Sequence, residues 1–154
     1  MLLQFEILGE IVIAMILGGA IGFERESADK PAGLRTHMLV AGSAALLTGL
    51  GRVLVQQFHM NESIISADPI RIIEAVITGI TFLGAGTIIR QRQGKEVEGL
   101  TTAASLLLVG AVGISVAMSQ FVLAIGATVI MLLTLRGVKY GEKKLAEQVE
   151  QVEQ

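Results

Sequence analysis

The chain has 154 residues, of which 52% are apolar and 17% charged, against roughly 25% charged residues in a soluble domain. A mean hydropathy of +0.66 means more apolar surface than a soluble protein of this size can bury, so we predict an all-α integral membrane protein. There is no cysteine, which excludes disulfides, thiolate metal sites and cysteine catalysis.

Five apolar segments lie between charged clusters and are predicted to be about five transmembrane helices. A helix needs about 20 residues to cross a bilayer, with a range of roughly 17–25, and the first four segments reach at least the lower end of that range. The fifth is short, and either borrows residues from its flanks or begins in a tight turn at Ser119–Gln120. A soluble helical bundle would show polar stripes, and the fourth segment has none. The segments are Ile7–Phe23, Met38–Val55, Ile70–Ile89, Leu100–Met118 and Phe121–Leu135.

The two ends of the chain suggest one membrane domain with a tail. The beginning carries Glu6 and Glu10 but no basic residue, so it lacks the features of a signal peptide and the first segment is expected to be retained. We assign residues 1–136 to the transmembrane domain. Residues 137–154 form a charged cytoplasmic tail, predicted to be helical because apolar residues recur at helical spacing.

Lysine and arginine predict the orientation, because cytoplasmic loops carry an excess of both. Ten of the twelve basic residues fall on one side if five segments cross the membrane. The expected arrangement has the N-terminus outside and the C-terminus in the cytoplasm. The loops near residues 24–37 and 90–99 then share the cytoplasmic side.

Small residues recur at four-residue spacing in four segments, a pattern typical of closely packed membrane helices. The stripes are Ala14, Gly18 and Gly22; Ala41, Ala45 and Gly49; Ala75 and Gly79; and Gly113 and Ala117.

An internal duplication is a second organising hypothesis. A shift of 66 residues places Leu17-Gly18 on Leu83-Gly84, and Gly33-Leu34-x-Thr36 on Gly99-Leu100-x-Thr102, without a gap. The first two helices would then be repeated, in the same orientation, as the third and fourth. Chance matches between apolar segments remain the alternative.

The first loop holds the densest charge in the first half of the chain. Arg35 can reach lipid phosphates or pair with an acid of the loop. His37 is expected to make hydrogen bonds at the interface rather than to bind a metal or respond to protons. The alternative for the whole loop is a solvated segment that only fixes topology. The candidate functional residues here are Glu24, Arg25, Glu26, Lys30, Gly33, Arg35, Thr36 and His37.

The second and third loops supply the remaining candidates. Asp68 is expected to cap the third helix, with Arg71 and Glu74 paired behind it, although two carboxylates there could also hold a cation. Thr101 or Thr102 is expected to cap the fourth helix, whose N-terminus could hold an anion. The candidates are Asp68, Arg71, Gly84, Gly86, Arg90, Gly99, Thr101, Thr102 and Ser105.

Several function classes find no support in the sequence. The glycines around Gly84 follow no strand and precede no lysine, so they do not form a phosphate-binding loop. No catalytic set of residues lies within one loop, and no basic face suits nucleic acid. We therefore predict that the protein is not an enzyme, binds no nucleic acid, and needs neither a cofactor nor a metal.

Three stretches resemble the MgtC/SapB family of bacterial inner-membrane proteins, between about Gly18 and Gly113. They are Gly18-x-x-x-Gly22-x-Glu24-Arg25-Glu26 continuing through Lys30-Pro31-Ala32-Gly33-Leu34-Arg35-Thr36-His37, Asp68-Pro69-x-Arg71-Ile72 with Thr78-Gly79-Ile80-x-Phe82-Leu83-Gly84-Ala85-Gly86 and Arg90, and Val97-x-Gly99-Leu100-Thr101-Thr102-Ala103-Ala104-Ser105.

The resemblance implies a multi-pass plasma-membrane protein with a cytoplasmic C-terminus. It also implies a link to low magnesium, to virulence in pathogens, and to modulation of membrane machinery such as ATP synthase. Many relatives add a soluble C-terminal domain that this chain is expected to lack, and some have Asn at the positions of His37 and Thr101.

The leading functional hypothesis is a non-enzymatic regulator in magnesium or acid-stress adaptation. It would act through a cytoplasmic surface of Glu24, Arg35 and Gly99–Thr102, and self-association is open. The alternative is a transporter or channel subunit for Mg²⁺ or another small ion.

Overall fold

The computed structural model describes residues 2–59, 68–90 and 99–152, which form helices, with short turns between α1 and α2 and between α4 and α5. The all-α prediction is confirmed. Helices α1 to α4 are long and apolar enough to cross a membrane, whereas the apolar part of α5, Phe121–Gly137, is shorter. The helices are α1 (Leu2–Ser27), α2 (Leu34–His59), α3 (Pro69–Arg90), α4 (Leu100–Ala117) and α5 (Phe121–Val152).

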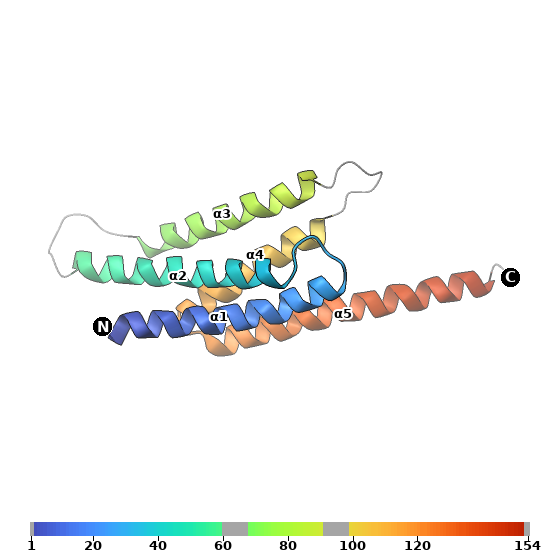
Figure 1. Ribbon diagram of the computed structural model, residues 1–154, viewed down its shortest axis with the longest axis horizontal. Coiled ribbons are helices and arrows are strands. Elements are labelled where there is room, and N and C mark those ends of the chain that lie inside the picture. Colours follow the sequence, from blue (N-terminus) through green and yellow to red (C-terminus); the bar gives the residue numbers. More distant parts are fainter. Residues whose placement is uncertain (1, 60–67, 91–98, 153–154) are drawn as a thin grey trace.

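Consecutive helices run in opposite directions, so the bundle has two ends (Figure 1). One holds the turn of residues 28–33 between α1 and α2, and the start of α4; we call it the 28–33 end. The other holds the turn of residues 118–120 between α4 and α5, and the start of α3; we call it the 118–120 end. Helix α5 starts at the 118–120 end and extends past the other helices. Which end faces the cytoplasm remains a prediction.

Helix α4 forms the centre of the bundle, because it contacts each of the other four helices. Of its apolar window, 56% of the residues are buried, against 17% in α3. Val109, Val112 and Val116 are at most 1% exposed and form much of the core. By contrast, α3 packs on α2 and α4 alone among the described helices, and it is the most peripheral of the four long ones.

Three of the four predicted stripes of small residues lie in helix contacts. A Cβ added at Gly18 would lie 2.7 Å from the carbonyl oxygen of His37, and one at Gly22 would lie 2.8 Å from the Cα of Leu34. Here α1 and α2 touch backbone to backbone, which explains the glycines. The prediction is wrong for α3: Ala75 and Gly79 are exposed, because no neighbouring helix covers this face.

The shift of 66 residues recurs in the helix contacts. Helices α2 and α4 begin at Leu34 and Leu100, which the shift superposes. In the first pair Gly18 faces the carbonyl oxygen of His37, and in the second Gly84 faces that of Ala103, at 3.5 Å from an added Cβ. The two residues of the second contact therefore each lie 66 positions after those of the first, as a duplicated hairpin requires.

The turn of residues 118–120 confirms the predicted tight entry into α5. Ser119 has a φ of 59°, and its N–H donates to the Val116 carbonyl at 2.8 Å. The N–H of Gln120 donates to the Ser115 carbonyl at 2.9 Å. Helix α5 continues without a break across the predicted domain boundary at residue 136, and the division into domain and tail stays a prediction.

The outer surface of the bundle is apolar along its length. Phe82 on α3 is 83% exposed and Val122 on α5 is 89% exposed, and many other large apolar side chains also point outward. Soluble monomers do not expose apolar surface on this scale. Together with the four long apolar helices, this places the protein in a lipid bilayer.

Candidate functional site

The turn of residues 28–33 is held by a carboxylate of α1. The Leu34 N–H, at the start of α2, donates to Glu26 Oε2 at 2.8 Å, so Glu26 satisfies an N–H that the helix itself leaves free. A Cβ at Gly33 would lie 2.6 Å from the same oxygen, so a larger residue there would displace this carboxylate. The Lys30 N–H closes the turn on the Arg25 carbonyl at 3.0 Å. Glu26 and Gly33 thus shape the turn.

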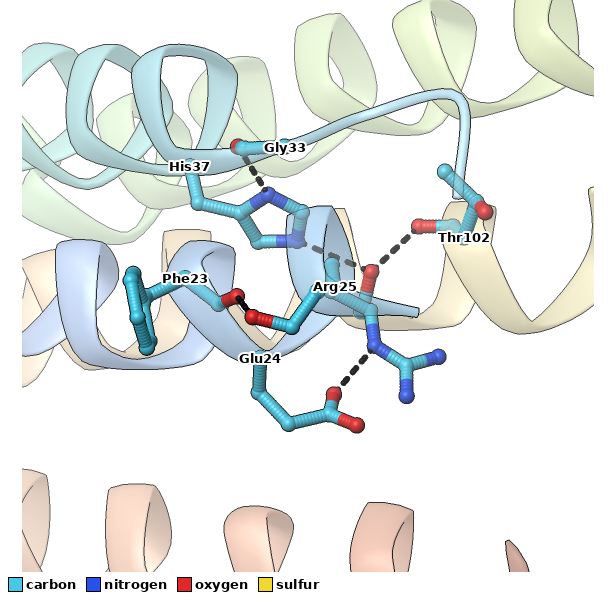
Figure 2. A network of polar contacts seen from close by, with 8 residues as sticks. Phe23, Glu24, Arg25, Gly33, His37 and Thr102 are labelled. Atoms are coloured by element: carbon cyan, nitrogen blue, oxygen red, sulfur yellow. Dashed lines mark hydrogen bonds and ion pairs between the residues drawn. The ribbon is translucent and has the colours of Figure 1, made fainter. Parts of the chain in front are cut away.

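Directly beneath this turn, His37 connects α2 to α4. Its Nδ1 lies 2.9 Å from the carbonyl oxygen of Gly33, and its Nε2 lies 3.0 Å from Ser105 Oγ (Figure 2). Ser105 Oγ in turn lies 2.7 Å from the carbonyl oxygen of Thr102. His37 is fully buried, and Ser105 and Thr102 are 1% exposed. The predicted hydrogen-bonding role of His37 is confirmed, but deep in the protein rather than at its surface.

The protons in this chain of contacts can be assigned from chemistry alone. The Gly33 carbonyl can only accept, so Nδ1 of His37 must carry a hydrogen. In the neutral imidazole Nε2 then has none, and the Ser105 hydroxyl donates to it. If Nε2 is also protonated, it donates to Ser105 Oγ, and the hydroxyl donates to the Thr102 carbonyl instead. The atom to which the Ser105 hydroxyl donates therefore depends on the protonation state of His37.

We expect neutral His37 to be the Nδ1–H tautomer, which ¹⁵N NMR of the labelled imidazole can identify. Ser105→Ala should leave Nε2 buried without a partner and lower the free energy of unfolding by about 1–3 kcal/mol. Ser115→Ala is the matched control on α4, because its hydroxyl bonds only within the helix, to Ala111 O. A predominant Nε2–H tautomer would contradict the assignment.

Glu24 and Arg25 form an ion pair between neighbouring residues of α1. Arg25 Nε donates to Glu24 Oε2 at 2.6 Å, and both side chains are almost fully buried (Figure 2). The expectation that Glu24 belongs to an exposed contact surface is therefore wrong. Each charge is buried beside the other, because an isolated buried charge would be costly. Arg35 does not pair with Glu24 or Glu26 and is exposed.

The start of α4 also differs from the sequence expectation. Neither threonine caps the helix: the N-cap is Gly99, with φ 97° and no side-chain hydrogen bond. Glycine takes this left-handed conformation readily, so the chain turns into α4 without a side-chain cap. Thr102 is buried and contributes its carbonyl to Ser105, whereas Thr101 is exposed.

The remaining candidates are dispersed over α2 and α3. Asp68 does cap α3, since its Oδ1 accepts from the Ile70 N–H at 3.0 Å. Arg71 and Glu74 are exposed and do not form the expected pair.

Gly84 lies in the contact between α3 and α4, whereas Gly86 has no neighbour within 4 Å of an added Cβ. Thr36 is half-buried near the start of α2, and Arg90 is the last residue of α3. Residues 91–98 of the third predicted loop lie outside the described residues.

Sequence reasoning missed a second buried ion pair, near the 118–120 end. Arg52 of α2 donates to Glu10 Oε2 of α1 at 2.5 Å, and Glu10 is 3% exposed. Within the described part of the chain, Glu10 Oε1, Thr48 Oγ1 and Arg52 Nε are buried without hydrogen-bond partners. A pocket of about 380 Å³, lined by Thr48 and Arg52, opens beside them. The signal was present, because Glu10 lies one turn before Ala14 on the α1 stripe, and Arg52 lies three residues after Gly49, the last residue of the facing α2 stripe.

The chemistry of these groups is structural hydrogen bonding and charge pairing. Within residues 2–59, 68–90 and 99–152, no group of three His, Cys, Asp or Glu side chains could hold a metal ion. His37 contacts a serine, but its Nδ1 faces a carbonyl oxygen where a catalytic triad would place a carboxylate.

These features define a multi-pass membrane protein with buried polar contacts at both ends of a helical bundle. A model of the MgtC family matches residues 11–144, and the chain belongs to that family. Protein MgtC of Salmonella typhimurium (strain LT2) is 39% identical over 132 residues, covering 85% of this chain and 52% of the relative. The putative magnesium transporter YhiD of Escherichia coli K12 is 35% identical over 134 residues, covering 84% and 59%. The chain spans a little over half the length of these relatives. No solved structure matches it.

Proposed function

We propose that this protein is a non-enzymatic regulator of the bacterial inner membrane, which acts through contacts with another membrane protein during adaptation to low magnesium or acid stress. Membership of the MgtC family supports a role at the membrane, and the printed name of the relative YhiD supports a connection with magnesium. The resemblance noted from the sequence adds the stress connection and suggests ATP synthase as one candidate partner. A second copy of the chain is another.

The observation that carries this proposal is the rigid turn at the 28–33 end. Glu26 fixes the entry to α2, and His37 ties that helix to α4. Lys30 and Arg35, on and just beyond this turn, are exposed and take part in neither contact. A fixed backbone that displays basic side chains suits recognition of an acidic partner surface, because little conformational entropy is lost on binding.

Transport of Mg²⁺ or another small ion is the second candidate. Its support is the group of buried Glu10, Thr48 and Arg52 atoms that find no partner among the described residues, beside the 380 Å³ pocket. Ionisable groups inside membrane segments often mark ion paths. However, Arg52 neutralises Glu10 and would repel a divalent cation, so we rank this function below regulation.

A charge reversal on the turn tests the regulatory function. We expect Lys30→Glu to lose most of its ability to restore growth of a deletion strain at low magnesium, because an acidic partner would repel it. Arg71→Glu, the same reversal on an exposed residue at the 118–120 end, should complement fully. The natural chain has no cysteine, so single introduced cysteines can verify that both variants keep their topology. Full complementation by Lys30→Glu would reject the contact surface.

A further inference from the structure

A groove runs along the outside of the bundle between α2 and α3, with a volume of about 480 Å³. Along α2 it is lined from Arg35 to Leu47. Twelve helical steps of 1.5 Å give it a length of roughly 18 Å, comparable with half of the roughly 30 Å hydrocarbon core of a bilayer. Leu39 and Leu47 are 62% and 48% exposed, so the groove opens outward. Its dimensions match one leaflet.

The floor of the groove is narrow and apolar. Ala44, Val76 and Ile114 form a small buried cluster that joins α2, α3 and α4 beneath it. Ala75 and Gly79 belong to the lining, and an added Cβ at Gly79 meets no atom within 4 Å. Because these side chains are small, they leave the space between α2 and α3 unfilled on the outer side. The stripe that packs against no helix therefore lines this groove.

The polar groups of the groove gather near one end. Arg35 is exposed at the 28–33 end and is the one charged residue in the described part of the lining, with Thr36 beside it. Farther along, the lining is apolar apart from Ser43. Among the described residues of its lining, the groove thus has a positive end and an apolar length, without an acid. This distribution complements a long apolar ligand with an anionic head.

We propose that this groove binds an anionic phospholipid, with an acyl chain between α2 and α3 and the phosphate at Arg35. Basic residues at the membrane surface attract anionic headgroups. A transmembrane helix fits less well, because an apolar helix packed on this groove would leave Arg35 without an anionic partner, whereas the phosphate of a lipid supplies one. This proposal does not depend on the regulatory function.

Native mass spectrometry of the full chain in detergent tests the site, with phosphatidylglycerol and phosphatidylcholine of identical acyl chains as probes. We expect wild type to retain phosphatidylglycerol about fivefold better than phosphatidylcholine, because a single basic residue contributes an attraction of about this size to an anionic headgroup. Gly79→Leu should fill the groove and abolish retention of phosphatidylglycerol. Arg35→Gln should remove the preference while keeping the weaker binding of phosphatidylcholine.

Gly9→Leu is the matched control, because Gly9 also has no neighbour within 4 Å of an added Cβ, lies outside the groove and is exposed on α1. Its lipid retention should equal that of wild type. Unchanged retention in Gly79→Leu would overturn the proposal, and so would an unchanged preference in Arg35→Gln. Displacement by Gly79→Leu of a copurifying protein, with lipid retention unaffected, would assign the groove to a partner helix instead.

Discussion

Gly113→Ala should destabilise the bundle by about 2 kcal/mol or more, although alanine favours helix over glycine. The added Cβ would overlap the Ala41 carbonyl oxygen and lie 3.0 Å from the Ala44 Cβ, where α2 crosses α4. Overpacking typically costs about 1–3 kcal/mol, and the high end is expected because a backbone atom cannot swing aside. The gain in helix propensity, about 1 kcal/mol, offsets only part of that cost. Thermal unfolding in detergent, followed by size-exclusion chromatography, measures the effect.

Gly86→Ala is the matched control for this substitution. An added Cβ at Gly86 meets no atom within 4 Å, so the same change should leave stability unchanged or raise it by up to about 1 kcal/mol. The opposite signs at the two positions are the diagnostic result. Equal melting temperatures for Gly113→Ala and wild type would mean that α2 and α4 do not cross at Gly113.

Arg52→Leu should have the second large effect, a loss of about 3 kcal/mol, because it leaves the Glu10 carboxylate buried without its partner. Breaking a buried pair typically costs about 3–5 kcal/mol, and the low end applies because the Arg52 side chain is 29% exposed. Urea or thermal unfolding of purified protein gives the measurement. Arg71→Leu provides an exposed arginine on α3 as the control, with little expected change.

The double variant Glu10→Leu/Arg52→Leu separates pairing from packing. Replacing both members of a buried ion pair with apolar residues is often neutral or stabilising, so the double variant should recover most of the stability lost in Arg52→Leu. A double variant as unstable as the single one would show that Arg52 acts through its other contacts. Glu10 and Arg52 would then be independent residues.

The helices could be predicted from the sequence because long apolar runs and their charged boundaries are local features. The turn at Ser119 and the cap at Asp68 were likewise found, since each depends on a few neighbouring residues. The threonine caps of α4 were mispredicted because the N-cap is Gly99 in a left-handed conformation, and no side chain caps the helix. Local patterns identify the elements, but they do not choose between two ways of starting a helix.

The candidate site was less predictable, because its contacts join residues far apart in the chain. His37 and Ser105 are 68 positions apart, and nothing near either one indicates the other. Glu24 was assigned to the surface because it lies in a charged cluster, yet packing buries it with Arg25. Charge density directs attention to the 28–33 end of the bundle, but burial decides which of its residues remain exposed.

Magnesium flux into proteoliposomes tests the proposed function most directly. Purified protein would be reconstituted into vesicles that contain a Mg²⁺-sensitive dye, after its folded state is verified by thermal unfolding. If the protein is a regulator whose buried charges are paired, the dye signal should equal that of protein-free vesicles, with and without a membrane potential. Saturable, protein-dependent Mg²⁺ entry would contradict the regulatory function and establish transport.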